Sequence, residues 1–320
     1  NSSFFEYKFF KDIPDLFLED GNSLTKIQSD FYNDVKFPNY DNVEDFGSLL
    51  DKSRRSIFVK KLDDEIPMGS NILEAGCGTG QLSITLSRYA RQIYGIDLSK
   101  GSLIEAKQFI NSNDIKSVHL FRMNIFKLFF KENTFDVIIS NGVLHHTYNP
   151  KLAFSKLVRV LKPGGIIVIG LYHSYGRIIQ NIKQSLIKNF GDSFKFLDKR
   201  FREKISYKKK YAWFLDQYKN PSETTHTYLE VLNWFKVENI EFLSSIPFDF
   251  NPENKLFQKR EAKNRFEIFL NEISLAFNLR QISEGGFFVM IGKFVLRSII
   301  YIKFDCLKND QISIPAMAFL

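Results

Sequence analysis

The stretch Ile72-Leu73-Glu74-Ala75-Gly76-Cys77-Gly78-Thr79-Gly80 runs from an apolar segment through a carboxylate into three alternate glycines. In the residues that follow, 81–90, Leu82, Leu86 and Tyr89 lie about one helical turn apart. The sequence therefore predicts a buried strand, a tight turn and the start of a helix. Glycine tolerates positive φ and lets a ligand approach the backbone, and free N–H groups at a helix start can bind an anion. We interpret the stretch as a cradle for a nucleotide-type ligand.

The spacing of the glycines separates two kinds of cradle. A dinucleotide fingerprint, G-x-G-x-x-G, would need its third glycine at position 81, where Gln81 stands. Asp97 follows Glu74 by 23 residues and ends the apolar segment 92–96. An acid at the tip of a second strand is placed to accept hydrogen bonds from both ribose hydroxyls. The pattern predicts a ligand with a ribose and disfavours a nicotinamide-dependent enzyme.

From Pro67 onward, predicted strands and helices alternate. Strands are expected at 71–75, 92–96, 118–122, 135–140 and 166–171, and helices at 80–90, 100–111 and 151–161. Later in the chain we expect a helix at 223–235 and strands at 237–244 and 286–292. Such alternation predicts a parallel sheet covered by helices on both faces, with ligands bound outside the carboxyl ends of its strands.

Four segments carry a family resemblance. Residues 73–80 and 94–99 resemble the first two motifs of the class I S-adenosylmethionine-dependent methyltransferases. Residues 141–146 and 161–165 resemble that family's fourth-strand end and the turn before its fifth strand. The match spans roughly 67–172, and the group that includes the ubiquinone and menaquinone C-methyltransferases looks most similar.

The resemblance implies both a fold and an activity. The implied fold is α/β, with a Rossmann-like, doubly wound, seven-stranded sheet whose last strand is antiparallel, and with a helical cap insertion. The implied activity is in-line methyl transfer at the carboxyl ends of the strands, with S-adenosyl-L-methionine as the cofactor. These motifs are specific for the cofactor and say little about the substrate.

The resemblance also assigns cofactor-binding residues. Glu74 would help to hold the methionine ammonium, Asp97 the ribose, and Leu98 one face of the adenine. Asn124 stands where the family commonly has an Asp, and its amide oxygen can accept the same bond from adenine, although a role as a turn residue is open. The full predicted set is Glu74, Gly76, Cys77, Gly78, Gly80, Asp97, Leu98, Asn124, Ile125, Asn141 and Gly142.

Four residues are candidates for chemistry on the acceptor: His145, His146, Tyr172 and His173. Histidine takes up a proton near neutral pH, which suits O- or N-methylation, but one histidine of the pair is equally compatible with a structural role. A general base is needed only if the accepting atom carries a proton with a high pKa. No cluster of Cys, Asp or Glu with metal-ligand spacing accompanies the histidines, so we expect no metal.

The chain is expected to divide into five segments. They are an N-terminal extension at 1–66, partly helical and able to cover the cofactor, a Rossmann-like core at 67–173, a basic helical cap insertion at 174–222, the rest of the core at 223–296 with an insertion at 248–283, and a tail at 297–320. In the extension, Tyr32, Tyr40 and Arg54 are candidates for lining the site, although simple packing or solvation explains them better.

Composition gives weaker guidance on location. The two cysteines, Cys77 and Cys306, provide no disulfide framework, which favours a reducing compartment. No signal-peptide pattern opens the sequence, and no run of apolar residues is long enough to span a bilayer. We therefore expect a cytoplasmic protein, with no obligate protein partner evident.

The charge of the chain is concentrated in one segment. Residues 177–219 hold twelve Lys and Arg against four Asp and Glu, an excess equal to the formal net charge of +8 for all 320 residues. Aromatic residues are interleaved with these bases, among them Phe194, Phe196, Phe201, Tyr207, Tyr211, Trp213 and Phe214. A helical cap with solvated lysines outside and aromatic residues packed inside is the favoured interpretation. An anionic small molecule or carrier is the next alternative, and RNA or an anionic membrane surface is open but not favoured.

The sequence thus predicts a methyltransferase acting on a small or carrier-borne molecule. An RNA-modifying methyltransferase and a catalytically inactive, cofactor-binding scaffold protein are the alternatives.

Overall fold

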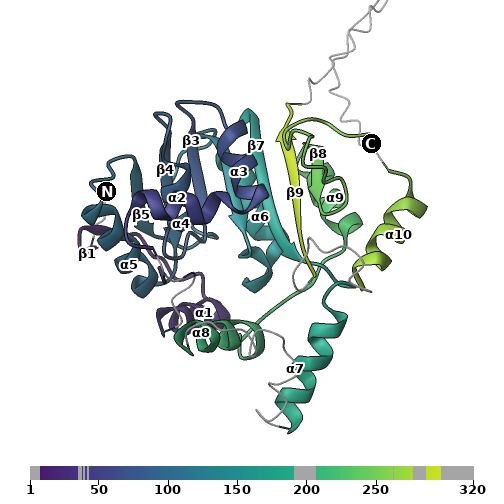
Figure 1. The fold of residues 1–320 in the computed structure, drawn as a ribbon, viewed down its shortest axis with the longest axis horizontal. Helices are drawn as coiled ribbons and strands as arrows, with labels where there is room; N and C mark the ends of the chain where they lie inside the picture. The colour runs from purple at the N-terminus through teal and green to yellow at the C-terminus, as the bar shows by residue number, and fades with distance from the viewer. Residues whose placement is uncertain are drawn as a thin grey trace, which may run out of the picture.

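The fold is that of a computed structural model (Figure 1). The structure describes residues 8–34, 38, 40–41, 43–190, 207–261, 263–276 and 286–296. The expected tail at 297–320 lies outside the described residues, as do 191–206 of the cap insertion and 277–285 of the second insertion.

The described strands form one mixed sheet in the order β1-β2-β5-β4-β3-β6-β7-β9-β8. Their bounds are β1 Lys8–Phe10, β2 Ile13–Asp15, β3 Asn71–Ala75, β4 Gln92–Asp97, β5 Val118–Arg122, β6 Phe135–Asn141, β7 Leu161–Tyr172, β8 Ile240–Ile246 and β9 Phe287–Phe294. β9 is antiparallel to both of its neighbours, β7 and β8. The Rossmann-like α/β architecture is confirmed.

The predicted number of seven strands is wrong, because the described residues alone form nine strands of this sheet. The hairpin of β1 and β2 extends the edge beside β5, where Asp15 lies opposite Arg122. Each of these strands has only three residues, too few to give a periodic pattern in the sequence.

Helices cover both faces of the sheet. Their bounds are α1 Ser23–Asp34, α2 Phe46–Arg54, α3 Ile57–Glu65, α4 Gln81–Leu86, α5 Lys100–Ser112, α6 Pro150–Val160, α7 Ile178–Phe190, α8 Tyr207–Tyr218, α9 Tyr228–Val237 and α10 Arg265–Ala276, with a 3₁₀ turn at Leu144–His146. Helices α2 to α5 pack on one face, and α6, α9 and α10 on the other.

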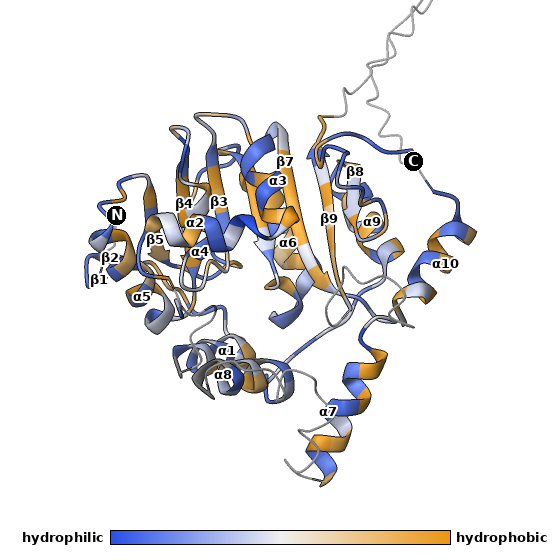
Figure 2. Ribbon diagram, in the orientation of Figure 1, coloured by the Kyte–Doolittle hydropathy of each residue, from blue (hydrophilic) through white to orange (hydrophobic). Residues whose placement is uncertain are grey.

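Alternation along the strands supplies the two cores. On β3, Ile72 packs with Ile84 of α4, whereas the next residue, Leu73, faces the core that contains Phe154 of α6 and Trp234 of α9. A strand buried on both faces reads as a nearly continuous apolar run, and Figure 2 shows this for β7 and β9. The helices therefore fix the sheet from both sides.

Several predicted helix bounds differ from the observed ones. α4 ends at Leu86 and not at residue 90, because Tyr89 and Ala90 adopt positive φ of 60° and 57°. In the extension, which was expected to be partly helical, α2 and α3 are separate helices, since Ser56 caps α3 by accepting from the Val59 N–H. The helix expected from residue 223 begins at Tyr228, because the residues before it are extended.

The cap insertion contributes α7 and α8. Helix α7 leaves the carboxyl end of β7 and points away from the sheet (Figure 1). The turn after α8 instead returns to the carboxyl ends of the strands and contacts α1, through a 2.9 Å bond from the Gln28 amide to Asn220 Oδ1. Among the described residues, no helix has the length and apolar character needed to cross a membrane.

Two glycines allow β7 and β9 to meet where the insertion leaves the sheet. A Cβ on Gly176 would lie 2.6 Å from the Gly286 Cα, a backbone atom that cannot turn aside. By contrast, a Cβ on Gly47 in α2 would meet only Asp45 Oδ1, at 3.5 Å. The junction therefore depends on the absence of a side chain at Gly176.

We predict that Gly176→Ala lowers the free energy of unfolding by about 1–3 kcal/mol, the usual range for overpacking. Gly47→Ala should leave stability unchanged or raise it by about 0.5–1 kcal/mol, because alanine is the better helix former. Urea unfolding followed by circular dichroism measures both. Equal stability of the two variants would contradict the close approach of the two glycines.

Candidate active site

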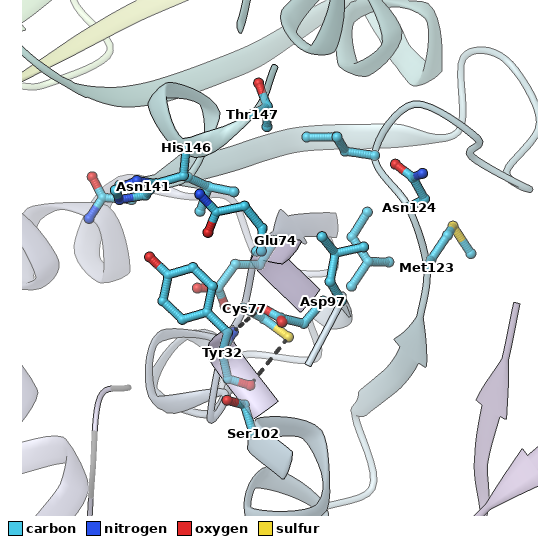
Figure 3. Close-up of a pocket in the computed structure, with 18 of the residues that line it drawn as sticks. Tyr32, Glu74, Cys77, Asp97, Ser102, Met123, Asn124, Asn141, His146 and Thr147 are labelled. Carbon is cyan, nitrogen blue, oxygen red and sulfur yellow. Dashed lines mark hydrogen bonds between the residues drawn. The ribbon is translucent and has the colours of Figure 1, made fainter. Parts of the chain in front are cut away.

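A cavity of about 420 Å³ lies at the carboxyl ends of the central strands (Figure 3). Its walls come from α1, from the turn after β3, and from the ends of β4, β5, β6 and β7. Twelve of the fifteen predicted site residues line it: Glu74, Gly76, Cys77, Gly78, Asp97, Leu98, Asn124, Ile125, Asn141, Gly142, His146 and Tyr172. Gly80, His145 and His173 do not line it.

The glycine turn is built from positive φ values. Gly76, Gly78 and Gly80 have φ of 80°, 53° and 76°. A Cβ on Gly76 would also overlap the Val143 side chain, at 2.3 Å from the nearest atom. Gly80 serves only to turn the chain into α4, and a Cβ there would meet Ala106 at 3.2 Å. The first two of these glycines thus face the cavity, and the third supports the turn.

Glu74 is a buried carboxylate that lines the cavity. The Ser83 hydroxyl donates to it, and no Lys or Arg in the described part of the chain forms an ion pair with it. Burial, aided by the nearby Asp97 carboxylate and opposed by the hydrogen bonds from Ser83, raises the pKa of Glu74 to about 8. The cationic partner that we expected for Glu74 is therefore not a residue of the described protein, and a cationic ligand would fit this position.

Asp97 organises the other side of the turn. Its carboxylate accepts the Gly78 N–H and the Ser99 N–H, both at 2.8 Å. Burial raises the pKa of Asp97, while these N–H bonds act in the opposite direction. Because Cys77 beside it is also buried, the pKa of that thiol lies well above its usual value, and the thiol stays protonated. Asp97 can thus present its remaining oxygen lone pairs to a ligand in the cavity.

Asn124 lines the cavity, but its amide is already used by the protein. The amide nitrogen donates to Leu18 O and Asp20 Oδ2, each at 3.1 Å, and the amide oxygen accepts the Phe126 N–H at 3.0 Å. This placement supports the turn role that the sequence left open, because the oxygen expected to face adenine already has a donor. The N–H of Ile125 remains a candidate for a ring nitrogen.

The two adjacent histidines have different environments. His146 lines the cavity, and its Nδ1 lies 2.9 Å from the Ser222 carbonyl oxygen. A carbonyl can only accept, so the neutral ring carries its proton on Nδ1 and leaves Nε2 as an acceptor. His145 is fully buried behind it, and burial together with the neighbouring His146 lowers the pKa of His145 well below its usual value. Of the pair, only His146 is placed to touch a ligand.

His173, a predicted candidate for chemistry on the acceptor, does not line the cavity. Its ring is fully buried, and Nε2 lies 3.2 Å from Glu272 Oε1. The same carboxylate oxygen accepts the Tyr228 N–H at 2.8 Å. His173 therefore ties the end of β7 to α9 and α10, away from the cavity.

Tyr172 lines the cavity and is held from behind by the cap insertion. The Gln217 amide donates to its hydroxyl oxygen at 2.8 Å, and the Arg177 guanidinium lies 3.8 Å from its ring centre. Arg177 is itself fully buried and pairs with both carboxylate oxygens of Glu223 at 2.6 Å. These contacts fix one aromatic wall of the cavity.

The sequence predicted that the N-terminal extension could cover the cofactor, but it named no residue of α1 other than Tyr32. Thr25 and Gln28 line the cavity alongside Tyr32, which the sequence offered only as an option. Asn22, whose side chain accepts the Leu24 N–H, was the available signal for a helix start. The other two options in the extension lie elsewhere. Tyr40 donates to the Thr79 carbonyl, and Arg54 pairs with Asp63 and Asp64.

The buried Glu74 predicts a pH-dependent stability. Its folded pKa of about 8 lies above its ordinary value of 4.5, so between these values the folded chain binds the proton more tightly than the unfolded chain. The stability of the cofactor-free protein therefore falls as pH rises through this window, and it levels off above it. Glu74→Gln removes the ionisable group.

We expect Glu74→Gln to raise the melting temperature relative to the wild type, by a margin that grows from about pH 5 to about pH 8. Scanning calorimetry across this range measures the effect. Glu132→Gln, on an exposed residue paired with Arg159, is the matched control and should give a small, flat difference. A margin for Glu74→Gln that does not change with pH would show that the carboxylate is solvated.

Comparison with known proteins agrees with this geometry. Residues 73–169 match the family model described as a methyltransferase domain. Over 189 residues the chain is 28% identical to a demethylmenaquinone methyltransferase of Bacillus cereus (strain ATCC 10987 / NRS 248), a match covering 58% of this chain and 76% of that protein. Over 143 residues it is 27% identical to the protein of that name from Bacillus mycoides (strain KBAB4), covering 41% and 60%.

Two solved structures share the fold. PKMT2 from Rickettsia typhi in complex with AdoHcy aligns with a TM-score of 0.53 and 16% identity, covering 74% of this chain and 52% of that one. Geranyl diphosphate C-methyltransferase from Streptomyces coelicolor A3(2) aligns with a TM-score of 0.51 and 13% identity, covering 86% and 99%. These two structures show the fold alone. Residues 73–169 carry the methyltransferase domain, and with the glycine turn and Asp97 the chain resembles the class I S-adenosylmethionine-dependent methyltransferases, the quinone methyltransferases among them.

Proposed function

We propose that this enzyme methylates a small aromatic molecule that carries a ring hydroxyl, of the hydroquinone type. The observation that carries the proposal is the fixed ring of His146, whose Nε2 is an acceptor on the wall of the cavity. The relatives named for demethylmenaquinone support the same class of acceptor. The acceptor would occupy the end of the cavity farthest from the glycine turn.

The cofactor end of the cavity fits S-adenosylmethionine. Glu74, which lacks a cationic partner among the described residues, would hold the ammonium, and Asp97 would hold the ribose. Gly76 and Gly78 leave room for close approach to the backbone, and Leu98 and Ile125 would border the adenine. When bound, the cofactor supplies a methyl group activated by a sulfonium.

The acceptor end is lined mainly by aromatic and apolar side chains. Phe126 stacks on Tyr148 with ring centres 4.2 Å apart, and Tyr172 and Phe287 meet edge to face at 5.8 Å. All four line the cavity. Such walls suit a planar ring and exclude water from it.

His146 would act as the general base. A ring carbon becomes more nucleophilic when a hydroxyl on the same ring loses its proton, and Nε2 can take that proton because Nδ1 already holds its own. This step requires the reduced, hydroxylated ring, since a quinone has no hydroxyl proton to give. Tyr172, held by Arg177 and Gln217, would keep the ring in place.

The first test is binding. Titration calorimetry should show that S-adenosylhomocysteine binds and NAD does not. Asp97→Ala should weaken the binding of S-adenosylhomocysteine by roughly ten- to a hundredfold, because hydrogen bonds to a charged group contribute about 1.5–3 kcal/mol. Glu132→Ala, on an exposed acid far from the cavity, should bind as the wild type does. NAD binding without a response to S-adenosylhomocysteine would overturn the cofactor site.

The second test is turnover, with reduced naphthalene-1,4-diol as the acceptor. We expect His146→Asn to lower kcat by about 10²–10⁴, the usual contribution of a general base, while leaving S-adenosylhomocysteine affinity intact. His119→Asn is the control. His119 is half-buried and its ring bonds to Gln92, so this variant should keep full activity.

Unchanged turnover in His146→Asn would remove the base from this proposal. Binding of S-adenosylhomocysteine without methylation of any hydroxylated ring would instead favour the scaffold alternative. Methylation of RNA alone would favour the RNA-modifying alternative.

A further inference from the structure

Gln28 of α1 has an amide whose orientation is set by two acceptors. Its Nε2 lies 2.9 Å from Asn220 Oδ1 and 3.3 Å from the Ser222 carbonyl oxygen. Both partners can accept at these atoms, so the donor end of the amide must face them. The amide oxygen of Gln28, Oε1, is thereby fixed as the end that points away from Asn220 and Ser222.

That oxygen has no partner among the described residues. The Gln28 side chain is only 4% exposed, and it lines the cavity. A buried acceptor left without a donor costs about 1–3 kcal/mol, so proteins rarely leave one without a function. A donor on a ligand in the cavity would complete the bond.

His146 is fixed by the same carbonyl. Ser222 O accepts from His146 Nδ1 at 2.9 Å as well as from Gln28, so one backbone atom positions both side chains. Asn220 adds a 2.8 Å bond from its amide to the Tyr32 hydroxyl oxygen. The turn at 220–222 therefore positions two side chains that line the cavity, Gln28 of α1 and His146 of the 3₁₀ turn, whose remaining acceptor atoms are Oε1 and Nε2.

We propose that Gln28 is a specificity-determining residue whose Oε1 accepts a hydrogen bond from a second hydroxyl or amine of the methyl acceptor. The inference rests on the proposed function, in which His146 Nε2 faces the first hydroxyl. An ether or carbonyl oxygen at the second position would meet Oε1 with a lone pair and no proton. The site would therefore reject such analogues through an unpaired buried acceptor.

The cofactor also carries donors, in its ribose hydroxyls and its ammonium, so the experiment separates the two sources. Calorimetry is performed without oxygen on protein saturated with S-adenosylhomocysteine. The probes are naphthalene-1,4-diol, 4-methoxy-1-naphthol and 1,4-dimethoxynaphthalene. The affinity of S-adenosylhomocysteine alone is measured for every variant.

For the wild type we expect the diol to bind at least tenfold more tightly than the monomethyl ether, a difference worth about 1.4 kcal/mol. In Gln28→Met, an apolar side chain of similar length, this ratio should fall to about one. Gln184→Met is the matched control and should keep the wild-type ratio, because Gln184 also bonds to the insertion, at Gln217 O, but does not line the cavity.

Asn220→Ala removes one of the two acceptors that orient the Gln28 amide, and an intermediate ratio is expected. The melting temperature of each variant shows whether it is folded. If that of Gln28→Met is far below the wild-type value, Gln28→Leu takes its place.

If the Gln28 variant still binds and methylates the diol, and the ratio of its affinities for the diol and the monomethyl ether is unchanged, this inference is overturned and the proposed function stays in place. A loss of S-adenosylhomocysteine affinity with an unchanged ratio assigns Oε1 to the cofactor and also overturns it. Failure of all three probes to bind the wild type contradicts the acceptor class and the inference together.

Discussion

The bond between the Asp97 carboxylate and the Gly78 N–H joins the ends of two neighbouring strands, and the site is built around it. The Ile96 carbonyl reinforces this junction, because it accepts the N–H groups of both Gly76 and Cys77, at 2.8 and 3.0 Å. The turn can fold back onto β4 in this way only with glycines at positive φ and with no side chain between Gly76 and Val143. The same atoms that close the turn therefore shape the cavity wall, so local folding and ligand recognition cannot be separated here.

The central fold and the cofactor end could be predicted because their determinants are local in sequence. β3 was predicted at its observed bounds, since both of its faces are buried and its end is marked by glycines. The hairpin of β1 and β2 could not be predicted, because each strand has three residues and its place at the sheet edge depends on contacts with distant segments, such as the ion pairs of Asp15 with Arg122 and Lys100. Short edge strands leave no periodic signal.

The acceptor end was harder to predict because it is made by single contacts between distant segments. Gln28 and Asn220 are separated by 192 positions, and His146 and Ser222 by 76. The sequence offered His145, His146 and His173 on equal terms, but only the fold distinguishes them. In the fold, His145 is buried behind the cavity, His146 lies on its wall, and His173 bonds to Glu272, yet the sequence around each of them has no feature that tells these roles apart. No periodicity or spacing rule contains that information.

The distribution of charge explains how a strongly basic chain can bind a cationic cofactor. The net charge is +8, yet the buried cations are paired away from the cavity, Arg177 with Glu223 and Arg91 with Asp63. Along the cavity, by contrast, burial and the nearby Asp97 carboxylate both raise the pKa of Glu74 and so disfavour its ionisation unless positive charge is added. A ligand that brings a cation relieves this repulsion and is held by both acids, whereas a ligand without one is not. Methyl transfer removes the positive charge of the sulfonium but leaves the ammonium in place. If Glu74 holds the ammonium and Asp97 the ribose, as proposed above, both contacts are common to the methyl donor and to S-adenosylhomocysteine, so the acids select for the cofactor and not for its methylated form.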